Sequence, residues 1–118
     1  MGKLTYLLII LKQFWPKFET IIKRGEFSTR PRDFYDIYIL QELKTFNKEI
    51  FFEAVKRTAE HRETNHIFDE LQEQVKLISE SDNLKKQWER YILNYHYAKE
   101  ISYKDVVDKL KQLSKLFY

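Results

Sequence analysis

The sequence has no cysteine and, among 118 residues, only two glycines and two prolines. Without cysteine the chain forms no disulfide bond and no thiolate metal site, which fits a reducing cytoplasm. So few turn-forming residues disfavour a β protein and favour helices joined by short polar loops. A chain of this length usually folds around one core, so we predict a single domain over residues 1–118.

A long hydrophobic run is also missing. The most apolar stretch, residues 4–11, follows Lys3 and could be mistaken for a targeting signal. It is much shorter than the ~20 residues that span a bilayer, and no small-residue cleavage site follows it. We therefore expect a cytoplasmic protein with no membrane-spanning segment.

Apolar residues recur at helical spacing through the chain. A first stripe runs from Leu4 to Trp15, where Pro16 disfavours a regular turn. Further helices are predicted over residues 31 to about 46 and 47 to about 64. The next has Asp69 and Glu70 in its first turn and ends near residue 80, and another runs from residue 81 or 82 to about 95. Ser102 with Asp105 resembles a capping box that opens the last helix. The fold class is therefore predicted to be all-α, an antiparallel bundle of five to six helices with most aromatic residues in its core.

The start of the helix at residue 31 gathers unusual chemistry. Pro31 suits a first helical turn, and Asp33 places negative charge near the helix N-terminus. Asp33 and Asp36 share one face of this helix, while Phe34 and Ile37 share another. The charged face is explained most simply as a solvated surface, because i, i+4 pairs stabilise exposed helices by roughly 0.2 to 0.5 kcal/mol.

A resemblance to a known family adds a functional interpretation. Residues 17–25 form a Lys-led segment ending in Arg-Gly, and residues 30–37 read Arg-Pro-Arg-Asp-Phe-Tyr-Asp-Ile. These two segments resemble the last two motifs of the AbiEii/AbiGii nucleotidyltransferase toxins. Residues 58–62, 67–68 and 97–106 are similar to the helical tail of that family. The resemblance therefore runs from Lys17 to the C-terminus.

The resemblance implies transfer of a nucleotide from a triphosphate to an acceptor such as the 3′ end of transfer RNA, with magnesium. The setting would be a bacterial abortive-infection and phage-defence system with a cognate antitoxin. Carried over residue by residue, Lys17 would contact phosphate, and Arg30 or Arg32 would hold phosphate or the neighbouring carboxylate. Asp33 or Asp36 would be the acidic member of the site.

Two parts of the family pattern are absent. Members carry a Gly-Ser segment and a pair of closely spaced aspartates that bind the metal and the triphosphate, and neither Gly2 nor Gly25 begins such a segment. Metal ions neutralise charge in phosphoryl transfer, so this loss is serious. We therefore expect a C-terminal region of such a toxin, inactive by itself, with no metal or cofactor of its own.

The genetic code suggests an origin for residues 1–16. Read from the third base of the Phe14 codon, the codons of residues 14–17 spell Leu-Ala followed by Glu, Gln, Lys or a stop. The family reads Glu-Thr-[Ile/Val]-Leu-Ala-Glu-Lys at this place, whereas here Pro16 precedes Lys17. We interpret residues 1–16 as an out-of-frame extension and residues 17–118 as the family region.

Charge and exposed surface indicate partners. Residues 1–32 carry seven Lys or Arg against two Glu, and a basic edge is formed by Lys12, Lys17, Lys23, Arg24, Arg30 and Arg32. Such an edge suits nucleotide phosphates or an RNA backbone. A different interpretation is a helical interaction module that contacts an antitoxin or forms a homodimer through exposed apolar surface.

A third interpretation rests on Arg90 and His96. Their Arg-x5-His spacing resembles the short signature of HEPN ribonucleases, in which the two side chains act on an RNA 2′-hydroxyl. The spacing arises easily by chance, and on one helix the two residues would be rotated by roughly 120°. His61 and His66 lack cysteine or carboxylate partners at ligand spacing, so we predict no zinc site.

Overall fold

The computed structural model describes residues 10–42, 48–64 and 66–117. It contains six α-helices, which confirms the predicted all-α bundle: α2 (Trp15–Arg24), α3 (Pro31–Gln41), α4 (Lys48–His61), α5 (Ile67–Glu80), α6 (Asp82–Asn94) and α7 (Tyr103–Ser114). Three short turns accompany them: the π-helical η1 (Ile10–Phe14) and the 3₁₀ turns η2 (Gly25–Phe27) and η3 (His96–Ala98). No strand occurs in the described ranges.

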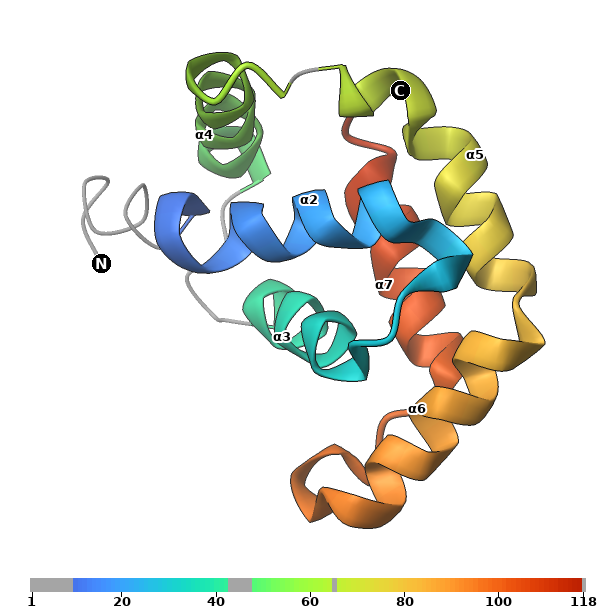
Figure 1. Ribbon diagram of the computed structural model, residues 1–118. Coiled ribbons are helices and arrows are strands. Elements are labelled where there is room, and N and C mark those ends of the chain that lie inside the picture. The colour runs from blue at the N-terminus through green and yellow to red at the C-terminus, as the bar shows by residue number, and fades with distance from the viewer. Residues whose placement is uncertain (1–9, 43–47, 65, 118) are drawn as a thin grey trace.

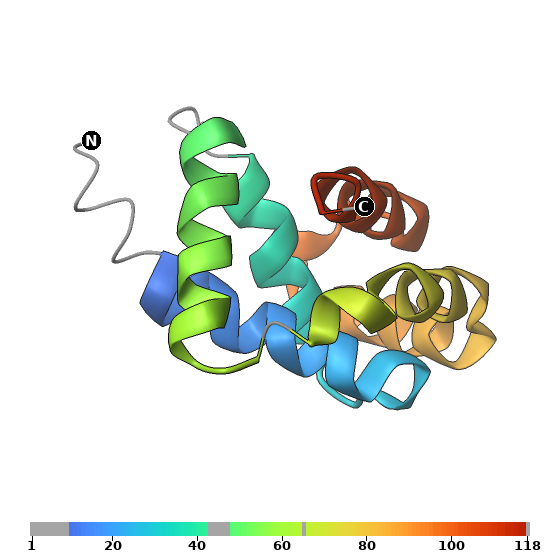
Figure 2. The same ribbon diagram turned by 90° about the horizontal axis from the view of Figure 1, so that it is seen from above.

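Helix α2 occupies the middle of the molecule (Figure 1). Its fully buried side chains follow one another at helical spacing: Trp15, Phe18, Ile21 and Ile22. The turn η1 leads directly into α2, and helix α4 packs against η1. Helices α3 and α5 pack against α2 itself. Helix α7 packs against both α3 and α5, while α6 packs against α3 and is followed by η3 (Figures 1 and 2).

The turn before Pro16 is not a regular α-helical turn, as predicted, but the helix continues through this residue. Pro16 occupies the second position of α2, directly after the π turn of η1. Proline removes one backbone donor and crowds the carbonyl four residues earlier, and a wider π turn accommodates both effects. Phe14 and Trp15, predicted to lie on an accidental extension, are 1% and 0% exposed in the core. The out-of-frame origin stays a prediction, and residues 1–9 lie outside the described ranges.

Two predicted helix ends lie too far along the chain. Helix α3 ends at Gln41 rather than near 46, and the Glu42 N–H donates to the Ile39 carbonyl in a tight last turn. Residues 43–47, including the predicted cap Asn47, fall outside the described ranges. Helix α4 ends at His61 in a Schellman motif: Glu63 adopts a φ of 57°, and the Thr64 N–H donates to the Ala59 carbonyl at 2.9 Å. A glutamate in this left-handed position gives no sequence signal, because glycine usually takes it.

The later helix boundaries agree with the prediction. Helix α5 carries Asp69 and Glu70 in its first turn and ends at Glu80. The Ser81 hydroxyl accepts from the Leu84 N–H at 3.1 Å and caps α6. Ser102 and Asp105 form both hydrogen bonds of the predicted capping box, at 3.1 and 3.0 Å. The predicted C-terminal half of the bundle is therefore confirmed.

Candidate functional site

The site begins with Lys17 on α2. The apolar side chains on either side of it, Trp15 and Phe18, are buried, so the backbone at Lys17 is held by the core while its own side chain stays 34% exposed. Thr20 donates its hydroxyl to the Pro16 carbonyl at 2.8 Å, which adds a side-chain hydrogen bond across the first turn of α2. The backbone that carries the Lys17 side chain is therefore held in place, and the ammonium group extends from it towards solvent.

Helix α3 supplies the carboxylates. Pro31 is its first residue, as predicted, and Phe34 and Ile37 are buried on the face that packs into the core. Asp36 is partly exposed beside that face, whereas Asp33 is 3% exposed. The prediction placed both carboxylates on one free charged face. That is wrong for Asp33, because the close packing of α2 and α3 covers the first turn of α3.

Lys17 and Asp36 meet although 19 residues separate them in the sequence. The Lys17 Nζ donates to the Asp36 Oδ2 at 2.6 Å, and the two side chains are 34% and 20% exposed. The Arg32 Nε lies 3.9 Å from the same oxygen, and the Arg32 side chain is 77% exposed. One carboxylate thus holds two cations from two helices, at a place that solvent still reaches.

Asp33 and Arg30 form a second pair at the same end of α3. The Arg30 Nε lies 3.4 Å from the Asp33 Oδ2. Burial raises the pKa of Asp33, and the nearby positive charges of Arg30 and Lys17 only partly oppose that effect. The structure therefore brings all five candidate residues of the resemblance together, with Asp36 on the accessible side and Asp33 on the buried side.

A tyrosine pair adjoins this cluster, and the sequence interpretation did not single it out. The hydroxyls of Tyr91 on α6 and Tyr97 in η3 are 2.5 Å apart. Burial, followed by the hydrogen bond with Tyr97, raises the pKa of Tyr91, and the charges of Asp36 and Arg32 also act on that hydroxyl. A signal existed in the close spacing of Tyr91, Tyr95 and Tyr97, but aromatic residues on a helical stripe usually belong to a core.

The basic edge is largely neutralised. Of its six cations, Lys17, Lys23, Arg30 and Arg32 have carboxylate partners, and Lys23 lies 3.4 Å from Glu19. A phosphate that binds here must therefore compete with carboxylates for the ammonium and guanidinium groups. The cluster is a set of ion pairs rather than a bare positive surface.

Arg90 and His96 do not share a helix, which corrects the assumption behind their predicted rotation. Helix α6 ends at Asn94, the backbone of Tyr95 is extended, and His96 begins η3. Both side chains are exposed. The structure therefore places the two residues on separate elements, and their ribonuclease role stays a prediction.

The described residues contain no group of three or more His, Asp, Glu or Cys side chains that could hold a metal ion. Asp33 and Asp36 are each paired with a cation in this structure. Within the same described ranges, none of the helices has the length and apolar character needed to cross a membrane.

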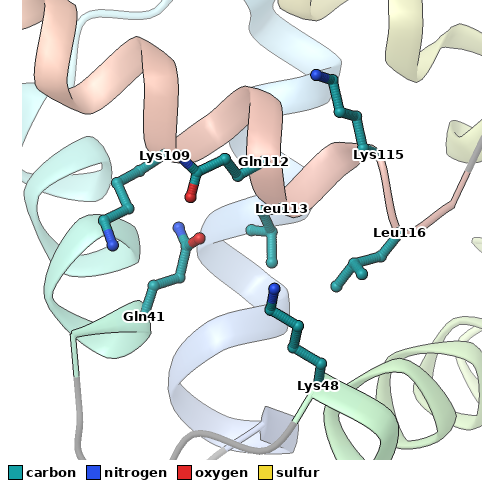
Figure 3. A pocket seen from close by; sticks show the side chains of 7 residues that line it. All are labelled: Gln41, Lys48, Lys109, Gln112, Leu113, Lys115 and Leu116. Carbon is teal, nitrogen blue, oxygen red and sulfur yellow. The ribbon is translucent and has the colours of Figure 1, made fainter.

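A second cationic place lies at the far end of α3 (Figure 3). It is a hollow of about 380 Å³ lined by Gln41, Lys48, Lys109, Gln112, Leu113, Lys115 and Leu116. Lys48 points into the space, as do the amides of Gln41 and Gln112, whereas Lys109 pairs with Glu42 (Figure 3). Gln41 lies about 13 Å along the helix axis from Arg32, at 1.5 Å per residue. Lys48 therefore offers a charge-matched control for the cluster around Lys17.

Comparison with known proteins identifies one family. A family model described as nucleotidyl transferase AbiEii toxin, type IV TA system, matches residues 10–111. The match spans every residue of the Lys17–Asp36 cluster and begins seven residues before Lys17, where the sequence resemblance begins. No curated protein and no solved structure matches the chain.

Proposed function

Because the chain belongs to the AbiEii nucleotidyl transferase toxin family of type IV toxin–antitoxin systems, we propose that Lys17, Arg32 and Asp36 form the phosphate-binding side of a nucleotidyl-transfer site. One observation carries the proposal. The 2.6 Å contact between Lys17 and Asp36 brings a cation of α2 and a carboxylate of α3 together, with Arg32 close to the same oxygen.

The geometry supports a simple division of labour. Asp36 holds the Lys17 ammonium in place until phosphate oxygens compete for it, and the lysine then acts as a point charge. Arg32 is exposed enough to turn its guanidinium towards the same phosphates and to bind two oxygens at once. Arg30 and Asp33 form a neighbouring pair at the first turn of α3, with Asp33 buried and Arg30 exposed.

Residues that would bind the metal ion are not part of this proposed site. The sequence has no Gly-Ser segment followed by paired aspartates, and the two aspartates of α3 are each paired with a cation. We propose that the 118 residues alone transfer no nucleotide and that the metal-binding carboxylates come from outside them. The acceptor would be an RNA, in a bacterial cytoplasm where a cognate antitoxin opposes the toxin in phage defence.

Triphosphate binding tests the phosphate-binding side. Calorimetric titration with each of the four ribonucleoside triphosphates, with magnesium and with a chelator, should find binding. Lys17→Met and Arg32→Ala should each weaken it about 10- to 150-fold, as expected for a hydrogen bond to a charged group. Lys48→Ala removes the same charge at the hollow of Figure 3 and should leave the affinity unchanged. Equal losses in all three variants, or no binding to the unsubstituted chain, would refute the proposed site.

Nucleotide incorporation tests the second half of the proposal. The chain is incubated with magnesium, labelled triphosphates and transfer RNA, and we expect no label in the RNA. Robust labelling that Asp36→Asn abolishes would show that these residues catalyse the reaction unaided.

A further inference from the structure

In the part of the chain that the structure describes, the exposed apolar side chains are concentrated in one short segment. Among the described residues, four large hydrophobic side chains are strongly exposed, and three of them follow one another closely at the end of α6 and in η3: Leu93 (84%), Tyr95 (48%) and Tyr97 (55%). Most of the other aromatic side chains that the structure describes are buried in the core. A cluster of this kind costs solubility unless something covers it.

The rings of this segment form an ordered stack. Trp88 is 1% exposed and packs on Tyr91 at 5.3 Å between ring centroids, with 29° between the planes. Tyr91 packs on Tyr95 at 4.7 Å and 31°. The stack therefore begins in the core and ends at the half-exposed ring of Tyr95, where one more planar ring would continue it.

A second half-exposed ring flanks the end of the stack. Tyr97 lies 5.8 Å from Tyr95 and 4.8 Å from Tyr35 of α3. The turn that carries it is fixed by the buried Ala98, whose N–H donates to the Tyr95 carbonyl at 3.0 Å. Rings held in this way lose little conformational freedom when a ligand arrives.

Two exposed cations, Arg90 and Lys99, flank the rings. His96 is exposed between them, and the exposed carboxylates Glu89 and Glu100 lie next to these two cations in the sequence. On the other side, the charges of both Asp36 and Arg32 of the ion-pair cluster act on the Tyr91 hydroxyl. Aromatic faces flanked by exposed cations are the arrangement that proteins use for single-stranded nucleic acid.

We propose that the ring stack ending at Tyr95, together with Tyr97, binds a nucleobase of single-stranded RNA and delivers the adjoining phosphates to Arg32. The inference rests on the proposed function, because it treats Arg32 as a phosphate ligand. It extends that function by giving the RNA a docking surface of its own, on α6 and η3. The proposed site selects unpaired RNA, since a base inside a duplex cannot reach the rings.

Fluorescence anisotropy with a labelled eight-nucleotide RNA, single-stranded or annealed to its complement, tests the platform. The single strand should bind more tightly. Tyr95→Leu and Tyr97→Leu keep apolar volume but remove the ring, and each should weaken binding about 5- to 150-fold, the range found for one lost stacking contact. Tyr95→Phe keeps the ring and should bind normally. Phe27→Leu changes an exposed ring on η2 and serves as the control.

The outcomes separate the platform from the phosphate site. If Arg32→Ala weakens RNA binding while both leucine variants bind normally, the phosphate site stands and the platform is refuted. If the leucine variants lose RNA binding while Arg32→Ala and Lys17→Met still bind triphosphates normally, the platform stands and the proposed phosphate site falls. A third outcome would also refute the platform. If the chain binds no RNA up to about 100 μM and instead forms a dimer that the leucine variants dissociate, the rings bind a second copy of the chain.

Discussion

Lys17 and Asp36 join α2 to α3 through a 2.6 Å contact, and their side chains are only 34% and 20% exposed. The protein contains a useful comparison in Arg57 and Glu53, which are also 2.6 Å apart but lie one turn apart on α4 and are 69% and 44% exposed. The two pairs differ in solvent exposure and in whether they connect separate elements. Exposed pairs contribute little because water screens them and both side chains lose freedom.

A double-mutant cycle should therefore give different coupling energies for the two pairs. For Lys17→Met and Asp36→Asn we expect about 1 to 1.5 kcal/mol, between an exposed pair and a hydrogen bond to a charged group. For Glu53→Gln and Arg57→Met we expect about 0.3 to 0.5 kcal/mol. Urea unfolding measures both, and the cycle largely cancels the separate attraction between Arg32 and Asp36. Equal couplings would mean that the contact between α2 and α3 is no stronger than a surface pair.

Asp33 should make the protein less stable at neutral pH than an asparagine would. Its pKa is raised from the ordinary 3.8, mainly by burial, so the folded protein binds this proton more readily than the unfolded chain does. Stability from that proton is present in acid and is lost as the pH rises through the folded pKa. We expect Asp33→Asn to be the more stable form at pH 7, with the difference disappearing as the pH falls below 3.8.

Urea unfolding of both forms from pH 3 to pH 8 measures this difference. A variant that is less stable at pH 7 would show that Arg30 and Lys17 outweigh the burial of the carboxylate. Triphosphate binding by Asp33→Asn gives a second readout, because the structure assigns the accessible role to Asp36. We expect that affinity to be retained.

Glu19 should show the opposite dependence on pH. Burial opposes the charged form of Glu19. The Thr64 hydroxyl and the charges of Lys23 and Arg62 outweigh burial and lower the pKa of Glu19 below 4.5. The Thr64 hydroxyl faces this carboxylate without a hydrogen bond of ordinary geometry. The stability from this carboxylate is present above pH 4.5 and is lost as the pH falls through the folded pKa. Glu19→Gln should cost about 0.5 to 1.5 kcal/mol at pH 7 and approach the unsubstituted protein in acid.

The indole of Trp15 gives this prediction a built-in control. Its Nε1 donates to the Glu19 Oε2 at 2.9 Å, and a glutamine can still accept that bond. Glu19→Ala removes the acceptor and should cost a further 1 to 3 kcal/mol, roughly, at every pH, because a buried donor is left unpaired. If both variants lose stability equally at pH 7, the indole hydrogen bond contributes nothing.

The sequence predicted the fold well where local signals decide the structure. The capping box at Ser102 and the cap at Ser81 are local hydrogen bonds, and both form as expected. The end of α4 was missed because Glu63 takes a conformation that its residue type does not favour. Pro16 disfavours a regular turn, as predicted, but the sequence did not show that a π turn would let the helix continue.

The candidate site was predictable only in part. The resemblance named Lys17 and Asp36, but their contact depends on how α2 packs on α3, which no local pattern specifies. Asp33 and Asp36 look equivalent from helical spacing, and packing alone makes one buried and the other accessible. Tyr95 lies beyond the end of α6, so a helical stripe assigned it to the core although it is half-exposed.

Gly25 should be the backbone position least tolerant of a side chain. It is buried after α2 with a φ of +52° and ψ of −129°, and an added Cβ would lie 2.1 Å from the Gln74 Oε1. We expect Gly25→Ala to cost about 1 to 3 kcal/mol, the range for a residue held in such a conformation. Gln74 ends in a flexible amide that can turn away, so most of the cost should come from the backbone. Urea unfolding of Gly25→Ala, Gln74→Ala and the double variant separates the two causes. If the glycine substitution becomes harmless once Gln74 is alanine, steric contact rather than backbone strain fixes this turn.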